Sequence, residues 1–297
     1  KKSTDLQGKT LMNLDQAIGS FLGLAIGDAL GCTLEFTKRK PEDKMHTEII
    51  GGGPFAVAPG SYTDDTCMAM AMATSLLKEK SFNAISIMQE FVFWYRDGKY
   101  SPSGQCDDIG ATTSQALRQW ETSQSYPYSG RTEEDTSGNG GVMRLAPIII
   151  WHRHIYENAM VDAVRQSLLT HASENCVRYA QALASILWNG STDPKKVYGM
   201  EMCALAPSDN WPHAGGDVMS ATKAAVWAVN GSSTFEEAVL KAVNLGGDSD
   251  TVGAIAGQIA GRIYGASSFP KRWLKALINE KEIRNLAIQL FKNSPTT

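Results

Sequence analysis

Glycine recurs at every fourth position along two long segments of this chain, and this spacing limits how the chain can fold. The two ladders are Gly19, Gly23, Gly27 and Gly31, and Gly253, Gly257, Gly261 and Gly265. An interior glycine destabilises a helix by about 1 kcal/mol relative to alanine, so a helix keeps several only where something offsets the loss. Close contact between two helix backbones does so, because glycine has no side chain to hold them apart. We therefore expect both segments to be packed helices at the buried centre of the protein.

Apolar residues recur at helical spacing through most of the chain, and turn residues such as Asn189-Gly190 separate the segments. We predict helices over residues 14–30, 67–78, 84–95, 109–120, 142–152, 160–170, 176–188, 216–229, 234–243, 251–264 and 270–291, with a break near 278–280 in the last. Asn13 and Gln16 form a capping-box pattern ahead of the first helix. No pair of alternating segments around a two-residue turn predicts a β-hairpin. The sequence therefore predicts an all-α, single-domain bundle.

Composition and charge exclude several classes of protein. The 297 residues are 43% hydrophobic, carry a net charge of −3 and contain no dense Lys/Arg run, so we expect no nucleic-acid surface. The longest apolar run, residues 145–151, is too short to span a bilayer, so we expect no membrane association. The cysteines are scattered without a CxxC pair. This favours reduced thiols in a cytoplasmic protein over disulfides or a zinc site.

Two short acidic clusters carry most of the chemical information. Residues 63–66 read Thr-Asp-Asp-Thr, and residues 248–251 read Asp-Ser-Asp-Thr after a glycine pair. Carboxylates this close repel one another and are costly to bury unless a cation neutralises them. Either cluster alone fits a solvated helix N-cap, where Asp, Ser and Thr are favoured. Because the patterns are nearly identical and each opens a helix of small residues, we expect one shared site for one or two hard cations, such as Mg²⁺ or Mn²⁺.

Four motifs in a fixed order support a resemblance to a known family. They are Gly27-Asp28-Ala29-Leu30-Gly31 with Glu35 downstream, Tyr62-Thr63-Asp64-Asp65-Thr66, Gly138-Asn139-Gly140-Gly141-Val142-Met143-Arg144, and Gly246-Gly247-Asp248-Ser249-Asp250-Thr251-Val252-Gly253. Over roughly residues 14–291 the chain resembles the ADP-ribosylglycohydrolases, the family of the dinitrogenase-reductase-activating glycohydrolase. The resemblance implies an orthogonal helical bundle that holds two Mg²⁺ or Mn²⁺ ions. It also implies removal of ADP-ribose from modified protein side chains, most often arginine.

The resemblance assigns roles to residues at the matching positions. It implies metal ligation by Thr63, Asp64, Asp65, Asp248, Asp250 and Thr251. Glu35 matches a glutamate that lies close to the reacting ribose, and Asp108 matches the acid of a substrate loop. Ala111 stands where the family has asparagine. We therefore expect recognition of the ribose or of the guanidinium group to differ here.

Hydrolysis of this kind requires two proton transfers, for which carboxylates are suited. Either Glu35 or one of Asp64, Asp65 and Asp250 could deprotonate the attacking water. Glu35 is the better donor to the leaving guanidine, because a metal ion acidifies the carboxylates that bind it. We therefore assign catalysis to Glu35 and Asp65.

The glycine-rich segment at residues 138–144 is a further candidate for ligand binding. Its backbone N–H groups at a helix start suit a diphosphate, although a simple turn and cap would have the same composition. His171 follows a predicted helix end and is placed near the ribose or adenine, with a structural histidine as the alternative. We assign substrate binding to Asp108, Gly138, Asn139, Gly140, Gly141 and His171. The aromatic candidates for contact with adenine are Tyr62, Trp211 and Tyr264.

Three functions are consistent with these patterns. The first is a metal-dependent hydrolase that acts on ADP-ribosylated protein and releases ADP-ribose. The second is an immunity or inhibitor protein that binds an ADP-ribosylating toxin on the same scaffold, with or without hydrolysis. Its binding element would be residues 1–12, a polar N-terminal extension ahead of the domain at residues 13–297. The third is a metal-dependent phosphohydrolase that releases inorganic phosphate from free nucleotides.

Overall fold

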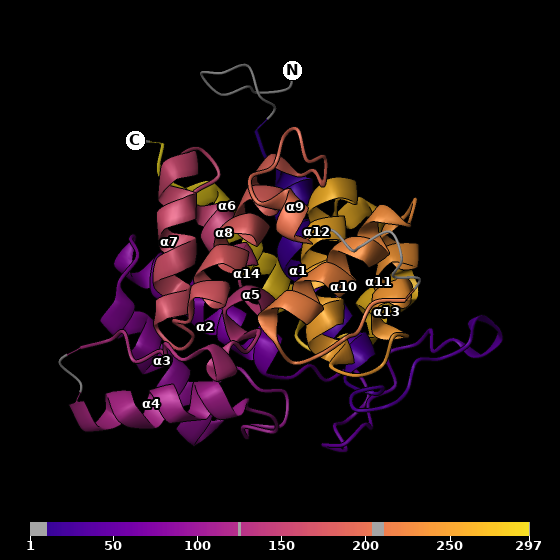
Figure 1. The fold of residues 1–297 in the computed structure, drawn as a ribbon, viewed down its shortest axis with the longest axis horizontal. Coiled ribbons are helices and arrows are strands. Elements are labelled where there is room, and N and C mark those ends of the chain that lie inside the picture. The colour runs from indigo at the N-terminus through magenta and orange to yellow at the C-terminus, as the bar shows by residue number, and fades with distance from the viewer. Residues whose placement is uncertain (1–10, 124–125, 204–210, 297) are drawn as a thin grey trace.

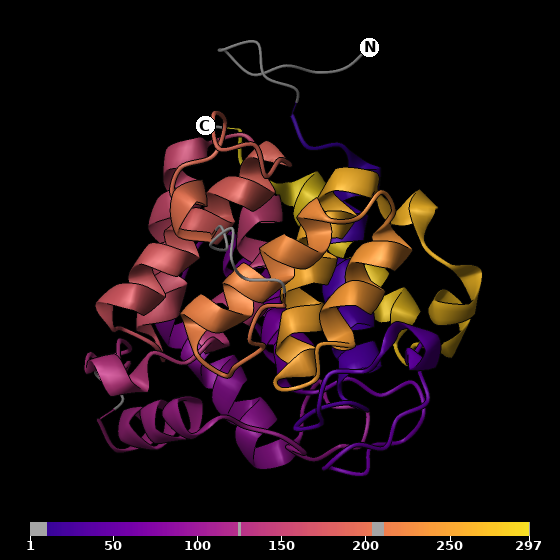
Figure 2. The same ribbon diagram turned by 45° about the vertical axis from the view of Figure 1, so that its right-hand side comes forward.

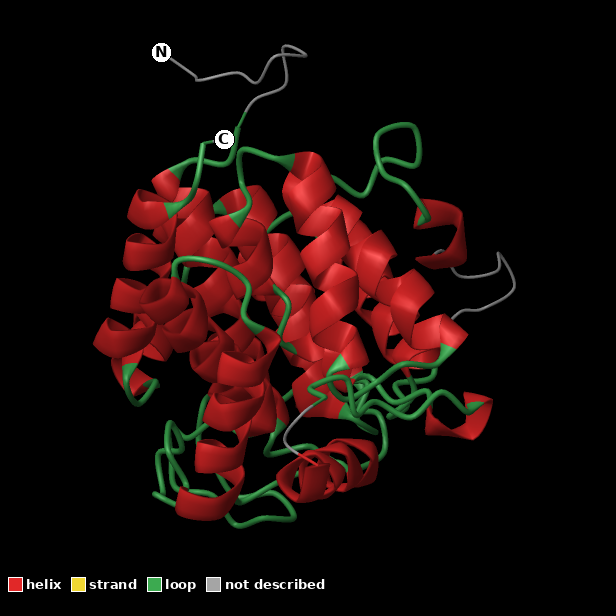
Figure 3. Ribbon diagram, turned by 90° about the vertical axis from the view of Figure 1, so that its left-hand side faces the viewer, coloured by secondary structure: helices red, strands yellow, loops and turns green. Residues whose placement is uncertain are grey.

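The computed structural model describes residues 11–123, 126–203 and 211–296. Within these ranges every regular element is a helix, and β-type pairing is limited to isolated bridges (Figure 3). The α-helices are α1 (Leu14–Gly31), α2 (Asp64–Glu79), α3 (Ala84–Asp97), α4 (Ala111–Ser123), α5 (Gly140–Met143), α6 (Ala146–Trp151), α7 (Tyr156–Leu168), α8 (Glu174–Asn189), α9 (Met200–Cys203), α10 (Val218–Asn230), α11 (Phe235–Val243), α12 (Ser249–Tyr264), α13 (Lys271–Ala276) and α14 (Glu280–Asn293). Short 3₁₀ helices are η1 (Glu42–Lys44), η2 (Glu134–Thr136) and η3 (Ala266–Ser268). The prediction of an all-α chain is confirmed.

Helices α1 and α12 run antiparallel through the centre of the bundle (Figures 1 and 2). Gly23 faces Gly257, and Gly27 faces Gly253. A Cβ atom built on any of these four would overlap the carbonyl oxygen of the facing glycine. Almost every residue of both helices is buried. The expected backbone contact is confirmed, although Gly265 lies just beyond α12, where it ends the helix with φ 78°.

The predicted continuous helix over residues 142–152 is wrong, because the chain breaks there into α5 and α6. Gln258 of α12 satisfies the backbone groups that the break leaves. Its side-chain oxygen accepts a hydrogen bond from the N–H of Ala146 at 2.8 Å. Its amide group donates to the carbonyls of Val142 and Met143. A buried side chain from a distant helix therefore supports this break, which local periodicity does not reveal.

The other expectations about organisation have mixed outcomes. The capping box of Asn13 and Gln16 is confirmed, as is the break near residues 278–280, where Asn279 has φ 57°. Residues 1–10 of the predicted N-terminal extension lie outside the described residues, so its role stays a prediction. Across the described ranges, no helix combines the length and apolar character needed to cross a membrane.

One end of the central helix pair positions the acidic clusters. Because α1 and α12 are antiparallel, the C-terminal end of α1 lies beside the N-terminal end of α12. The loop between α1 and α2, drawn in indigo to purple, extends along the lower right of the molecule in Figures 1 and 2. It returns the chain to the start of α2, where Thr63 contacts Asp28 of α1.

Candidate active site

The two acidic clusters meet where α2 and α12 begin. Thr63 Oγ1 lies 3.3 Å from Asp250 Oδ2. Carboxylate oxygens of Asp28, Asp65 and Asp250 lie within 4.8 Å of one another. Neither Thr63 nor Asp248 caps its helix through its side chain, and Asp65 and Asp250 are buried. The structure thus contradicts the alternative of two separate solvated helix caps.

Asp28, near the C-terminal end of α1, holds the start of α2 in place. Its carboxylate accepts hydrogen bonds from the backbone N–H and the hydroxyl of both Thr63 and Thr66, at 2.6–3.1 Å. Since the Thr63 hydroxyl has one proton and directs it to Asp28, its oxygen lone pairs remain for the cluster around Asp250. Sequence reasoning found Asp28 only as part of a motif, because its partners are 35 and 38 residues away.

The cluster carries charge that the described residues do not balance. No described Lys or Arg nitrogen lies within 4.0 Å of the carboxylates of Asp64, Asp65 or Asp250. Burial, with repulsion from neighbouring carboxylates, raises the pKa of all three well above the usual range. Both side-chain oxygens of Asp65 are buried without a hydrogen-bond partner. An all-oxygen set with orphaned carboxylate atoms fits a hard divalent cation.

A cavity of about 530 Å³ opens beside this cluster. Asp64, Asp248, Asp250 and Thr251 are among the residues that line it. Glu35 and Asp108 also line it, and each places a carboxylate oxygen within 4.8 Å of Asp250. Burial and neighbouring carboxylates raise the pKa of Glu35 to about 8 and that of Asp108 to about 7. Oε2 of Glu35 has no hydrogen-bond partner, so this carboxyl group is free to meet a ligand.

The glycine-rich segment that leads into α5 lines the same cavity. The Asn139 side chain donates a hydrogen bond to Asp248 Oδ2 at 2.7 Å, which joins this segment to the second acidic cluster. The backbone N–H of Asn139 is bound to the carbonyl of Gly216. Among the described residues, the N–H groups of Gly140 and Gly141 have no hydrogen-bond acceptor. Of these two residues only Gly140 lines the cavity, so its N–H is the donor that the segment presents to a ligand there.

Close packing against His171 explains two of the glycines. A Cβ on Gly138 would lie 3.0 Å from His171 Nε2, and one on Gly140 would overlap the imidazole ring. Gly138, Gly140 and His171 all line the cavity. The α-carbon of Gly141 instead packs against Ser167 of α7, and Gly141 does not line the cavity.

Arg144 determines which nitrogen of His171 carries the proton. Arg144 is fully buried, and its Nη2 donates to Thr170 Oγ1 at 2.7 Å. The Thr170 hydroxyl accepts from Arg144 and still has its own proton to donate; among the described contacts His171 Nδ1, 2.8 Å away, is the acceptor for it. The ring proton of His171 therefore lies on Nε2, the nitrogen beside Gly138. Burial lowers the pKa of His171 to about 3, so the ring is neutral and presents one N–H donor to the cavity.

None of the three aromatic candidates for adenine lines this cavity. Tyr62 is buried in the hydrophobic core. Tyr264 lies at the C-terminal end of α12, away from the cluster at its N-terminal end. Trp211 lines a separate cavity. The aromatic side chains that do line the acidic cavity are Phe36 and Phe55, which follow α1 in the loop that carries Glu35.

Comparison with known proteins agrees with this geometry. The sequence profile described as ADP-ribosylglycohydrolase matches residues 10–297. The chain belongs to this family. Among solved structures, an "ADP-ribosylglycohydrolase-related protein complex" superposes with a TM-score of 0.82 at 33% identity, covering 95% of this chain and 99% of the other. The expected orthogonal bundle of the ADP-ribosylglycohydrolase type is confirmed.

Two relatives of this chain have names that state an activity. The ADP-ribosylarginine hydrolase Tri1 of Serratia proteamaculans (strain 568) is 39% identical over 300 residues, which cover 95% of this chain and 81% of the relative. The ADP-ribosyl-[dinitrogen reductase] glycohydrolase of Rhodospirillum rubrum is 30% identical over 291 residues, which cover 91% of this chain and 93% of the relative. The two matched regions therefore span nearly all of the domain that carries the acidic cavity.

Proposed function

We propose that this ADP-ribosylglycohydrolase is a metal-dependent hydrolase that removes ADP-ribose from arginine side chains of modified proteins. The observation that carries the proposal is one cavity with an unbalanced carboxylate cluster and a set of neutral N–H donors. The carboxylates suit cations and a guanidinium group, whereas the donors suit the oxygens of ADP-ribose. Similarity to relatives named as ADP-ribosylarginine hydrolase and as dinitrogen reductase glycohydrolase supports the same chemistry.

The acidic cluster would hold the metal centre. We assign two Mg²⁺ or Mn²⁺ ions to Thr63, Asp64, Asp65, Asp248, Asp250 and Thr251. All donors are oxygens, which suit either ion, and the orphaned oxygens of Asp65 gain the partner that they lack. When bound, the ions would supply Lewis acidity, which lowers the pKa of water and polarises substrate oxygens. Asp28 supports the site by keeping the Thr63 hydroxyl proton turned away from the cluster.

Glu35 is the carboxyl group that we assign to the leaving guanidine. It lies on the cavity side of the cluster with one unpartnered oxygen, so it can place a proton on the departing nitrogen as the C–N bond breaks. Asp108 lies beside it, and in its charged form its carboxylate favours a positively charged guanidinium over a neutral linkage. Removal of the proton from the attacking water falls to Asp65, with Asp64 and Asp250 as alternatives.

The remaining wall would hold the rest of ADP-ribose. The N–H group of Gly140 lines the cavity and has no described partner, and a diphosphate offers several acceptor oxygens. His171 adds a neutral N–H through Nε2, and a neutral donor binds a phosphate or ribose oxygen without drawing charge from the acidic side. We propose that these groups and Asn139 orient the nucleotide.

Release of free ADP-ribose from an arginine-ADP-ribosylated protein tests the proposal, with Mg²⁺, with Mn²⁺ and with EDTA. We expect metal-dependent release. Glu35→Gln should lower turnover by about 10²–10⁴-fold while metal binding persists, because a general acid contributes about that much. Glu157→Gln on the exposed start of α7 is the matched control and should be unaffected.

Other results of this assay would indicate a different reaction, a different linkage or a reaction without metal ions. Release of inorganic phosphate from free nucleotides, without release of ADP-ribose, would identify the nucleotide phosphohydrolase. Release from serine adducts but not from arginine adducts would change the linkage and leave the hydrolase in place. Equal release in EDTA and in Mg²⁺ would remove the metal ions from the reaction.

A further inference from the structure

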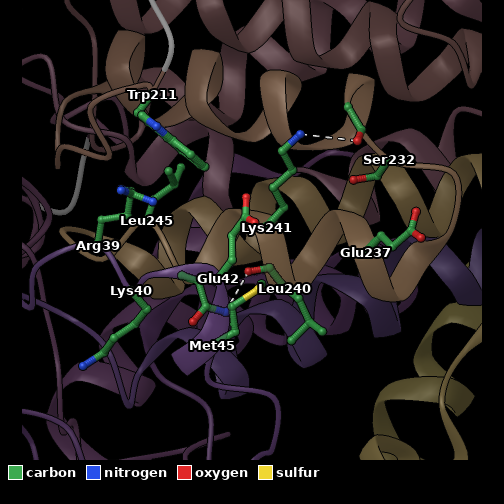
Figure 4. A pocket seen from close by; sticks show the side chains of 12 residues that line it. Arg39, Lys40, Glu42, Met45, Trp211, Ser232, Glu237, Leu240, Lys241 and Leu245 are labelled. Carbon is green, nitrogen blue, oxygen red and sulfur yellow. Dashed lines mark hydrogen bonds between the residues drawn. The ribbon is translucent and has the colours of Figure 1, made fainter.

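A second cavity, of about 600 Å³, lies outside the acidic site (Figure 4). We call it the Trp211 pocket. Its walls come from the loop after α1, which carries Arg39 and Lys40, from Trp211 ahead of α10, and from Leu240 and Lys241 on α11. No residue of the acidic clusters and none of residues 138–144 lines it. The reaction proposed above leaves this pocket without a role.

Two cationic side chains that line the Trp211 pocket lie over tryptophan rings, one of them Trp211 itself and the other Trp227 behind it. The Arg39 guanidinium lies 4.0 Å from the centre of the Trp211 ring. Lys241 Nζ lies 4.3 Å from the centre of the Trp227 ring, and the two tryptophans meet edge to face at 5.5 Å. Trp211 is 47% exposed even so. Tryptophan and arginine are among the residue types enriched at the energetic centres of protein interfaces.

The pocket has an excess of positive charge. Arg39, Lys40 and Lys241 line it against Glu42 and Glu237. One oxygen of Glu237 accepts a hydrogen bond from the backbone N–H that precedes the N-cap of α11. Within the described parts of the chain, none of the three cations has a carboxylate oxygen within 4.0 Å. Acidic groups of a partner would meet cations that have no described carboxylate partner within the chain.

One stretch of backbone connects the Trp211 pocket to the acidic cavity. The N–H of Phe36 donates to the carbonyl of Gly247 at 2.7 Å, and the N–H of Lys40 donates to the carbonyl of Asn244 at 2.8 Å. Phe36 is 72% exposed and lines the acidic cavity, whereas Arg39 lines the Trp211 pocket. Three residues of chain span at most about 10 Å, and the turn at Phe36, which has φ 59°, shortens this distance. The acidic cavity and the Trp211 pocket therefore have neighbouring walls built from one short segment, residues 36–40, within reach of a single polypeptide.

We propose that the Trp211 pocket is a docking site for the polypeptide of the modified protein itself. Its occupant is an acidic segment with one aromatic or large apolar side chain, placed about three to five residues from the modified arginine. The proposal rests on the hydrolase function proposed above. Charge complementarity and continuity with the mouth of the acidic cavity favour a polypeptide. A second nucleotide is disfavoured, because the pocket brings its cations on long separate side chains and has no glycine-rich loop.

The test compares substrates that differ only in their flanking polypeptide. They are ADP-ribosylarginine alone, a peptide with Glu and Trp about four residues from the ADP-ribosylarginine, and the same peptide with Lys in place of Glu. The enzymes are wild type, Arg39→Glu, Trp211→Ala and the control Lys281→Glu, which makes the same charge change on the exposed face of α14. Steady-state kcat and KM are measured for each combination of enzyme and substrate.

We expect Arg39→Glu and Trp211→Ala to raise KM for the acidic peptide by about fivefold to tenfold with kcat unchanged. Their kcat/KM for ADP-ribosylarginine alone should match that of wild type. The control Lys281→Glu should match wild type on all three substrates. Wild type should prefer the acidic peptide to the Lys peptide, and Arg39→Glu should lose this preference. Two results would overturn the docking site. One is an equal loss of kcat/KM by the two variants on ADP-ribosylarginine and on the peptides, and the other is no loss on any substrate.

Failure of the proposed reaction can be told apart from failure of the docking site. If wild type hydrolyses none of these substrates, the reaction is wrong, and fluorescence anisotropy of the labelled acidic peptide still tests docking. Arg39→Glu should then weaken binding of that peptide, and unchanged binding would refute the site. If AMP competes with the acidic peptide and Arg39→Glu abolishes AMP binding, the pocket is a nucleotide site and the polypeptide assignment is wrong.

Discussion

Replacement of Asp65 by asparagine should affect stability in opposite ways with and without metal. Asp65 is 0% exposed, and both of its carboxylate oxygens lack hydrogen-bond partners. Burial and the charges of neighbouring carboxylates raise its pKa. Without a cation, Asp65→Asn removes a buried carboxyl group whose charged form its neighbours repel, and it adds an amide that can donate to Asp28 or Asp250. We therefore expect the metal-free variant to be at least as stable as the wild type.

The expected changes in Tm follow from the coupling between metal binding and folding. One new hydrogen bond stabilises a folded protein by about 1 kcal/mol, which is about 2–4 °C in Tm for a chain somewhat shorter than this one. A metal ion at a concentration of about 100 times its Kd stabilises the wild type by about 2.7 kcal/mol, or about 5–10 °C. In Asp65→Asn the loss of a ligand should reduce this metal-dependent shift to below about 2 °C.

Thermal unfolding followed by circular dichroism provides the measurement, near neutral pH, in EDTA and in excess Mg²⁺ or Mn²⁺. Asp43→Asn, on an exposed carboxylate in η1, is the matched control and should keep the full metal-dependent shift. A variant that is destabilised in EDTA and still gains the full shift in Mg²⁺ would show that Asp65 stabilises the start of α2 and binds no cation. That result would refute the reasoning for the whole cluster.

Three further predictions follow from the same structure. Gly257→Ala would overlap the carbonyl of Gly23, so urea unfolding should show a loss of about 3 kcal/mol or more; an unchanged midpoint would contradict the contact. Asp28→Asn leaves two of its four donors facing the amide nitrogen, because each carboxylate oxygen accepts from at least two of them, and calorimetry should show Mn²⁺ affinity weakened by about 1–3 kcal/mol. The pKa of Glu35 rises from 4.5 to about 8 and that of Asp108 from 3.8 to about 7. The folded state thus binds more protons, and stability in EDTA should fall as pH rises from about 4 to about 8; a rise across this range would contradict the burial.

Sequence reasoning succeeded where the signal is local or repeated. The glycine ladders predicted the central helix contact, and most helices lie within a few residues of their predicted bounds. The helix over residues 142–152 was wrong, because Gln258 supplies the hydrogen bonds that replace those of a continuous helix. Tyr62 and Tyr264 were named by residue type alone, and residue type does not say which side chains line a cavity.

The sequence by itself determined that this protein is all-helical, that two glycine-lined helices pack at its centre and that two acid clusters open helices. Only the tertiary structure decided that the clusters form one site, because residues about 185 positions apart meet only where α1 and α12 cross antiparallel. It also decided the hydrogen bonds of Asp28 and the proton on His171, which depend on distances between side chains of different elements. Spacing along the chain reports on helices, whereas hydrogen bonds and buried charge depend on which helices become neighbours.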